Sequence, residues 1–62
     1  MRRSNVKSSQ VTNVTVIETL GRQVTKYGNL EYLAEKINCN VNGKPKTYIR
    51  HSYDNGMIDY MI

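Results

Sequence analysis

The sequence predicts an α+β fold, in which two short N-terminal helices precede a small antiparallel β-meander or hairpin. Two observations predict this class. Apolar residues recur at helical spacing in two runs that Gly28 separates. The last third of the chain carries two Asn-Gly pairs, which favour tight hairpin turns. We therefore expect a flexible basic tail over residues 1–10 and one small domain over residues 11–62.

Residues 1–10 are polar and basic and show no periodicity, which is typical of a flexible terminus. Arg2, Arg3 and Lys7 also give this segment the character of the basic arms that contact nucleic-acid phosphates. A frayed end and a phosphate-binding arm both fit these residues.

Residues 11–27 fit a helix, with a strand as the alternative. Five apolar side chains follow one another at spacings of three or four residues: Val14, Ile17, Leu20, Val24 and Tyr27. Thr15 and Glu18 have the spacing of a capping box. Against a helix, the first half of the segment is rich in β-branched residues, and Gly21 would cost a helix interior about 1 kcal/mol. The alternative is a strand over residues 11–18, with Gly21 in a turn.

A second helix is predicted for residues 29–38. Its apolar stripe has the spacing i, i+3, i+4 and i+7: Leu30, Leu33, Ala34 and Ile37. Gly28 can end the preceding helix in a left-handed conformation, and Asn29 can cap the next one. A helix of about ten residues is not stable in isolation, so the first helix or the sheet must cover this stripe.

Residues 38–62 carry two turn signals. Asn42-Gly43 suits a two-residue type I′ turn, and Asp54-Asn55-Gly56 suits a three-residue loop built from a type I turn and a bulge. These turns predict the cross-strand pairs Val41–Lys44, Cys39–Lys46, His51–Asp59 and Ile49–Met61. The competing interpretation is a helix over residues 45–53 that begins at Pro45.

Alternation in the second hairpin divides its side chains between two faces. One face holds Ile49, His51, Tyr53, Met57, Asp59 and Met61. The other holds Tyr48, Arg50, Ser52, Ile58, Tyr60 and Ile62. Neither face is purely apolar, so the pattern does not decide which one packs on the rest of the domain. Either choice leaves Tyr or Met exposed, which favours a protein partner or a dimer contact.

The composition limits the chemistry that the chain can perform. One Cys and one His cannot supply the four ligands of a structural zinc site, and we expect no metal and no cofactor. His51 and Asp59 could pair across the hairpin, but no nucleophile joins them on that face, so we expect a binding protein and not an enzyme. A domain of 62 residues without a disulfide is marginally stable alone, which favours a homodimer.

Charge and hydropathy bear on partners and location. Nine Lys and Arg against five Asp and Glu give a net charge of +4, which suits a polyanionic partner or simple solubility. No stretch is apolar enough to span a membrane, and no apolar run follows the basic N-terminal residues as it does in a signal peptide. We expect a cytoplasmic protein without membrane contact.

The run Tyr27-Gly28-Asn29, followed by L-A-E-K-I-N-C over residues 33–39, resembles the first half of a helix-turn-helix. It looks like the small Fis-type, NinH-type and Cro-type DNA-binding proteins of lambdoid phages, and the resemblance covers residues 27–39. It implies a transcription regulator of phage or mobile-element type, in which Ala34 lets the two helices approach closely. Cro-like proteins also end in a hairpin that pairs across a dimer.

The sequence departs from that pattern after Cys39. N-V-N-G-K-P follows before a second helix could begin, whereas a helix-turn-helix normally turns in three or four residues. Either the turn is longer and residues 46–51 form the reading helix, or there is no reading helix.

The residues that we expect to contact nucleic acid are Lys44, Lys46, Tyr48, Arg50 and His51, with Arg2 and Arg3 in the tail. In the sheet interpretation the first four alternate onto one face, where cations around an aromatic ring suit nucleic acid. The first functional hypothesis is a small basic DNA-binding regulatory protein. The alternative is a protein–protein inhibitor or adaptor of host-takeover or anti-defence type, acting through an exposed Tyr- and Met-rich sheet face or edge.

Overall fold

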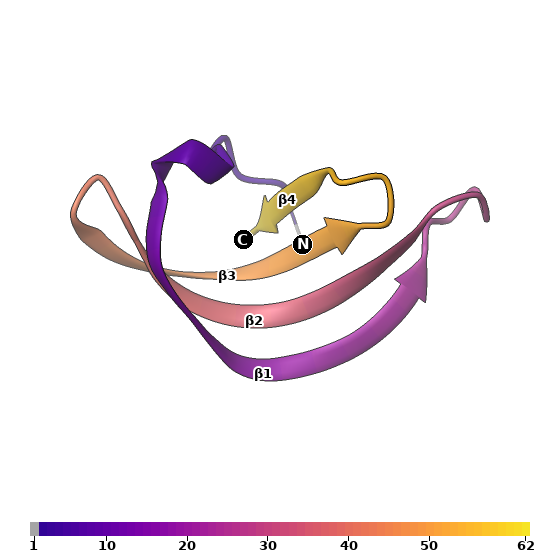
Figure 1. The fold of residues 1–62 in the computed structure, drawn as a ribbon, viewed down its shortest axis with the longest axis horizontal. Coiled ribbons are helices and arrows are strands. Elements are labelled where there is room, and N and C mark those ends of the chain that lie inside the picture. The colour runs from indigo at the N-terminus through magenta and orange to yellow at the C-terminus, as the bar shows by residue number, and fades with distance from the viewer. Residues whose placement is uncertain (1) are drawn as a thin grey trace.

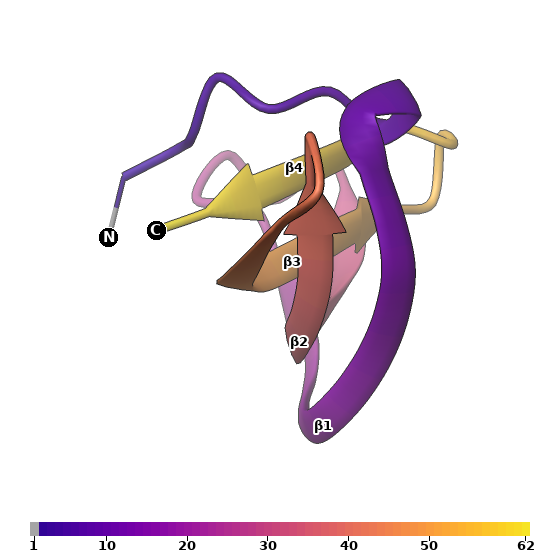
Figure 2. The ribbon, with the colours of Figure 1, turned by 90° about the vertical axis from the view of Figure 1, so that its left-hand side faces the viewer.

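The computed structural model describes residues 2–62, which form one antiparallel sheet of four strands in the order β1-β2-β3-β4 (Figure 1). The strands are β1 (Val11–Val24), β2 (Glu31–Val41), β3 (Lys44–Tyr53) and β4 (Ile58–Met61). A short 3-10 helix, η1 (Ser8–Gln10), precedes β1. Each strand pairs with the next along the chain, so the sheet is a meander. The long strands β1 and β2 are bowed, and the sheet curls toward β4 and the N-terminal residues (Figure 2).

The α+β prediction is wrong, because both segments predicted as helices are strands. The alternative of a strand over residues 11–18 gives the right secondary structure but the wrong end, because β1 has no turn at Gly21 and continues to Val24. The helix predicted over residues 29–38 is replaced by β2, in which alternate side chains from Leu33 to Val41 share one face. Ala34 lies on the other face and is also buried. Because this segment has apolar residues on both faces of the sheet, they occur at the i, i+3, i+4 and i+7 spacing that is typical of a helix.

No helix-turn-helix exists within residues 2–62. Residues 27–30 belong to the loop between β1 and β2, and residues 31–39 belong to β2. The segment that would have to hold a reading helix, residues 46–51, lies in β3. The expectation of a DNA-binding transcription regulator of phage type rested on charge, on size and on this pattern, and its helix-turn-helix part is wrong.

Three bulges shape β1. The strand uses 14 residues opposite the 11 of β2, and register shifts fall between Thr12 and Thr15, Val16 and Glu18, and Thr19 and Gly21. Each bulge bends its strand and increases the local twist. Gly21, at the third bulge, has φ +106°, a conformation that residues with a Cβ rarely adopt. The bulges account for the bowed shape of β1.

Both predicted turns are confirmed, and with them the register of the second half of the chain. Asn42 and Gly43 have φ values of +52° and +79°, as a type I′ turn requires. The observed pairs include Val41–Lys44, Cys39–Lys46, His51–Asp59 and Ile49–Met61. The competing helix over residues 45–53 is excluded, because these residues lie in β3.

The N-terminal residues cover the β4 edge of the sheet. The backbone N–H of Ser4 donates to the carbonyl of Tyr60 at 2.8 Å, and the N–H of Ile62 donates to the carbonyl of Arg2 at 2.7 Å. The tail predicted over residues 1–10 includes Met1, which lies outside the described residues. Over residues 2–10 the chain lies against the sheet and enters β1 through η1 (Figure 2).

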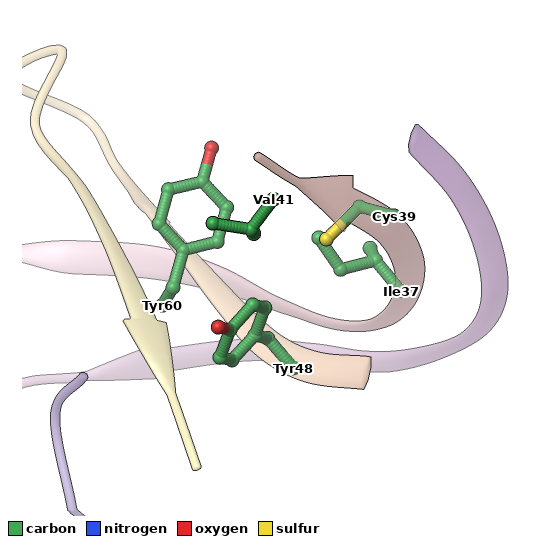
Figure 3. Packing of buried hydrophobic residues seen from close by; sticks show 5 residues of the cluster. All are labelled: Ile37, Cys39, Val41, Tyr48 and Tyr60. Carbon is green, nitrogen blue, oxygen red and sulfur yellow. The ribbon is translucent and has the colours of Figure 1, made fainter. Parts of the chain in front are cut away.

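The core is small and lies on one face of the sheet. It consists of Ile37, Cys39, Val41, Tyr48 and Tyr60, with Val6 and Val11 packed against it (Figure 3). The rings of Tyr48 and Tyr60 meet edge to face, with centroids 5.9 Å apart. This packing decides the open question of the second hairpin: the face with Tyr48 and Tyr60 is the core face. The opposite side of the sheet, with His51, Tyr53 and Met61, is called the open face.

Within residues 2–62, no helix has the length and apolar character needed to cross a bilayer.

Candidate functional site

The predicted nucleic-acid-binding residues of β3 do not form one surface. Lys44 and Lys46 are exposed near the turn between β2 and β3. Tyr48 is only 8% exposed in the core, so its ring is not free to stack on a ligand. Arg50, farther along the same face, is half-buried. His51 points to the open face, away from the other four.

Arg50 is held by an ion pair across two strands. Its Nη2 atom lies 2.9 Å from Oε1 of Glu35, and the two side chains are 22% and 13% exposed. The Nε atom of Arg50 is buried without a hydrogen-bond partner. Because the guanidinium is directed at Glu35 and largely shielded from solvent, this side chain stabilises the sheet and is poorly placed to bind a phosphate.

The two N-terminal arginines lie at the β4 edge. Arg2 uses its carbonyl oxygen to pair with Ile62, and its side chain is exposed. Arg3 forms a bridge with Met61, and its Nη1 atom lies 3.8 Å from Oδ1 of Asp59. The structure therefore separates these two residues from Lys44 and Lys46, which lie at the turn between β2 and β3.

The open face carries a cluster of three aromatic rings. Tyr32 of β2 stacks on His51 of β3, with centroids 4.4 Å apart and an interplanar angle of 29°. Tyr53 lies 5.2 Å from Tyr32 and 6.3 Å from His51. Tyr32 and Tyr53 are directly opposite in the register, and His51 is opposite Ala34, whose small side chain leaves room for the stacked rings. Strand alternation and cross-strand pairing together bring these residues into contact.

Hydrogen bonds to neighbouring strands hold the two tyrosines. The Tyr32 hydroxyl lies 3.0 Å from Oε1 of Gln23 in β1, and the Tyr53 hydroxyl lies 3.2 Å from Oδ2 of Asp59 in β4. Burial, followed by the nearby charge of Asp59, raises the pKa of Tyr53, so its hydroxyl stays protonated and donates to the carboxylate. The aromatic cluster is therefore pre-ordered by bonds to both outer strands.

His51 is neutral at pH 7. Burial lowers its pKa below the ordinary value of 6.5, and the negative charge of Asp59 only partly offsets this effect. A neutral imidazole has one N–H donor and one acceptor nitrogen, so its ring can contact either a carbonyl or an amide of a ligand.

A groove of about 580 Å³ runs along this cluster toward the loop between β1 and β2. It is called the aromatic groove, and its lining is Thr25, Lys26, Tyr27, Asn29, Leu30, Tyr32, His51, Tyr53 and Met61. Most of these side chains present apolar or aromatic surface, and Lys26 is the cationic residue among them. The volume lies within the range of ligand-binding pockets in proteins.

The loop between β1 and β2 forms one end of the groove. The N–H of Thr25 donates to the carbonyl of Leu30, and the N–H of Gly28 donates to the carbonyl of Thr25, both at 2.8 Å. Gly28 has φ +74°, so the left-handed conformation expected for it occurs here in a hairpin loop. Tyr27 is 79% exposed, and Nζ of Lys26 lies 5.4 Å from the centroid of its ring.

Sequence reasoning placed Tyr53 and Met61 on one face but missed the groove as a unit. The helix predicted over residues 29–38 includes Tyr32, so that prediction excludes the cross-strand contact of Tyr32 with His51. The alternation of residues 32–41 could have revealed it, because the register from the Asn42-Gly43 turn puts Tyr32 opposite Tyr53.

The described residues hold no cluster of three or more His, Cys, Asp or Glu side chains that could bind a metal ion. What the open face offers is a pre-ordered aromatic and apolar surface with a lysine at its rim. Comparison of the chain with protein-family models, curated proteins and solved structures finds no match.

Proposed function

We propose that the chain is a small adaptor or inhibitor that binds an extended peptide segment of another protein in the aromatic groove. The observation that supports this function is the cluster of Tyr32, His51 and Tyr53, which packs together on the face that the core does not use. An enzymatic role is not part of the proposal, because the His51 ring is packed against the two tyrosines as contact surface.

The groove suits an extended, proline-rich segment. Such segments form a polyproline II helix, which has no internal hydrogen bonds and docks into grooves lined by aromatic side chains. Tyr32 and Tyr53 offer flat surface for proline rings, and neutral His51 offers a hydrogen bond to the exposed backbone of the peptide. Because the cluster is already ordered, little side-chain entropy is lost on binding.

Charge favours an acidic residue beside the apolar part of the peptide. Lys26 lines the groove, and no ion pair holds it among residues 2–62. The chain carries a net charge of +4, which attracts acidic partners and raises the association rate. The proposed ligand is therefore a proline-rich segment flanked by Asp or Glu.

A titration followed by ¹⁵N NMR tests this function. The probe is a synthetic peptide of about ten residues, with a proline run and two aspartates at one end. Binding at the groove shifts the amide signals of Lys26, Tyr32, His51 and Tyr53 in a saturable manner. A matched peptide with lysines in place of the aspartates should bind more weakly.

Variants locate the contact. Tyr32→Ala is expected to raise the Kd at least about tenfold, because large aromatic side chains dominate such interfaces, whereas Tyr32→Phe keeps the ring and most of the affinity. Lys26→Glu should weaken binding of the acidic peptide. Lys44→Glu, an equal charge change at the first residue of β3 and outside the groove lining, should not. Shifts outside the groove, or stronger binding of a single-stranded oligonucleotide, would contradict the proposal.

A further inference from the structure

Two Asn-Gly pairs lie in exposed turns of the sheet. Asn42-Gly43 joins β2 to β3, and Asn55-Gly56 lies between β3 and β4 (Figure 1). In such a pair the next backbone nitrogen can attack the side-chain amide of the asparagine, because glycine has no Cβ to obstruct the approach. Every other asparagine of the chain is followed by a residue with a Cβ. By sequence alone, the two pairs are equal candidates for spontaneous deamidation.

The reaction needs two groups of the pair to be free. The backbone nitrogen of the glycine must lose its proton, and the side-chain carbonyl carbon of the asparagine must turn to meet it. A hydrogen bond donated by that N–H must be broken before the nitrogen can attack. A hydrogen bond accepted by the side-chain oxygen holds the amide in one orientation. Local hydrogen bonds therefore decide which pair can react.

Hydrogen bonds occupy both groups in the turn between β3 and β4. The N–H of Gly56 donates to the carbonyl of Tyr53 at 3.0 Å. Oδ1 of Asn55 accepts from the N–H of Met57 at 3.0 Å, which closes an Asx turn. The attacking nitrogen and the amide under attack are thus both held.

The turn between β2 and β3 leaves the same two groups free. Among the hydrogen bonds within residues 2–62, none involves the N–H of Gly43 or the side chain of Asn42. Both residues are exposed, so water can remove the proton and later attack the product. The two pairs therefore differ in the structure, although they are alike in sequence.

We propose that Asn42 is a site of spontaneous deamidation and that Asn55 is protected. The deprotonated nitrogen of Gly43 attacks Cγ of Asn42, the Cγ–Nδ2 bond breaks, and Nδ2 takes a proton from water and leaves as ammonia. Water then opens the succinimide ring. Breaking the bond from the ring nitrogen to Cγ gives aspartate, and breaking its bond to the backbone carbonyl carbon gives isoaspartate. One water is consumed, one ammonia is released, and no oxidant or reductant takes part.

The two products affect the hairpin differently. Aspartate keeps the main chain unchanged, and Asp-Gly also suits a type I′ turn. Isoaspartate places a side-chain carbon in the main chain, so the two-residue loop becomes one atom longer and no longer fits that turn. Because this turn sets the register of β2 on β3, isoaspartate at position 42 weakens the hairpin.

Peptide mapping of the whole protein during incubation at about pH 8 tests the proposal. Cleavage by trypsin after Lys36, Lys46 and Arg50 puts the two asparagines on different fragments. In the folded protein Asn42 should gain about one mass unit at least about tenfold faster than Asn55, as tandem mass spectrometry shows. In concentrated urea the ratio of the two rates should fall toward one, because the hydrogen bonds that protect Asn55 are lost.

A matched variant separates the effect of the backbone from that of the charge. Asn42→Asp carries the new carboxylate on an unchanged main chain, so its thermal midpoint should stay near that of the wild type. The isolated isoaspartyl form has the same charge and should unfold at a lower temperature. Equal rates at Asn42 and Asn55 in the folded protein, a faster reaction at Asn55, or a ratio that urea does not change would overturn the proposal.

Discussion

At the scale of single residues, the four buried or half-buried tyrosines divide by face. Tyr48 and Tyr60 pack edge to face inside the core, and Tyr32 and Tyr53 line the aromatic groove on the open face. All four are tyrosines in strands, so residue type does not predict which face of the sheet each one occupies. The position of each tyrosine along its strand decides the face, because neighbouring positions point to opposite sides of the sheet.

Cys39 should react slowly in the folded protein. Its side chain is 4% exposed, and burial raises the pKa of its thiol, so little reactive thiolate is present at neutral pH. We expect its reaction with Ellman's reagent at pH 8 to be at least about tenfold slower in buffer than in concentrated urea, because the thiol must first become accessible. Equal rates in the two conditions would contradict the placement of Cys39 in the core.

The ion pair between Glu35 and Arg50 should contribute more to stability than the shorter pair between Arg22 and Asp54. Both side chains of the first pair are mostly buried, whereas both side chains of the second are half-exposed. Glu35→Gln leaves the buried guanidinium without its carboxylate and should lower the free energy of unfolding by about 1–3 kcal/mol. Asp54→Asn should change it little, because water screens an exposed pair. Urea denaturation measures both, and similar losses for the two variants would argue against this account.

At the scale of elements, the turns set the register of the two hairpins in the second half of the chain, and the bulges set the curvature of β1. Asn42 and Gly43 set the register of β2 on β3, and that register carries Tyr32 to a position opposite Tyr53. The register shifts in β1 bend it around the core. The aromatic groove therefore depends on a turn at the far end of β2.

Gly43→Ala tests how much this turn stabilises the hairpin. Gly43 has φ +79°, and a side chain in that conformation costs about 1–2 kcal/mol, although no atom lies in the way of a Cβ. We expect the thermal midpoint to fall, while Lys44→Ala, at the neighbouring exposed position, should be nearly neutral. A midpoint that is the same in both variants would show that the turn does not limit the stability of the hairpin.

At the scale of the whole molecule, one curled sheet separates two surfaces with different roles. The core face gathers the side chains that hold the chain together (Figure 3). Val6 of the N-terminal segment packs against this core, and Ser8 of η1 lies within hydrogen-bond distance of the Tyr60 hydroxyl. The open face carries the groove, and β1 keeps several apolar residues partly exposed at the edge of the sheet. Peptide binding therefore uses the face of the sheet that the core leaves free.

Stability of the whole molecule should fall as the pH drops below about 6.5. His51 has a lowered pKa in the folded state, so between that pKa and the unfolded value of 6.5 the unfolded chain binds more protons than the folded one. The contribution of a neutral His51 is complete above 6.5 and is lost as the pH falls through the folded pKa. Urea midpoints between about pH 7 and pH 5 should decline in the wild type and decline less in His51→Gln; parallel curves would contradict this role of His51.

The sequence by itself determined the turns and the register of residues 39–62. Asn42-Gly43 and Asp54-Asn55-Gly56 act through the φ angles of adjacent residues, which local chemistry fixes without reference to the rest of the chain. The same local signals did not determine residues 11–38, where apolar residues fit both helical and strand spacing. Pairing with β3 and burial of Ile37, Cys39 and Val41 make residues 31–41 a strand, and residues 11–24 become a strand by pairing along it.

The tertiary structure alone decided which side chains meet. The sequence placed Lys44, Lys46, Tyr48 and Arg50 on one face, but it could not show that Tyr48 fills the core or that Arg50 is held by Glu35. The contact of Tyr32 with His51 follows from the Asn42-Gly43 turn only once residues 31–41 are known to be a strand, and the local apolar spacing did not decide that. Local conformation follows from neighbours in sequence, whereas a binding surface follows from neighbours in space.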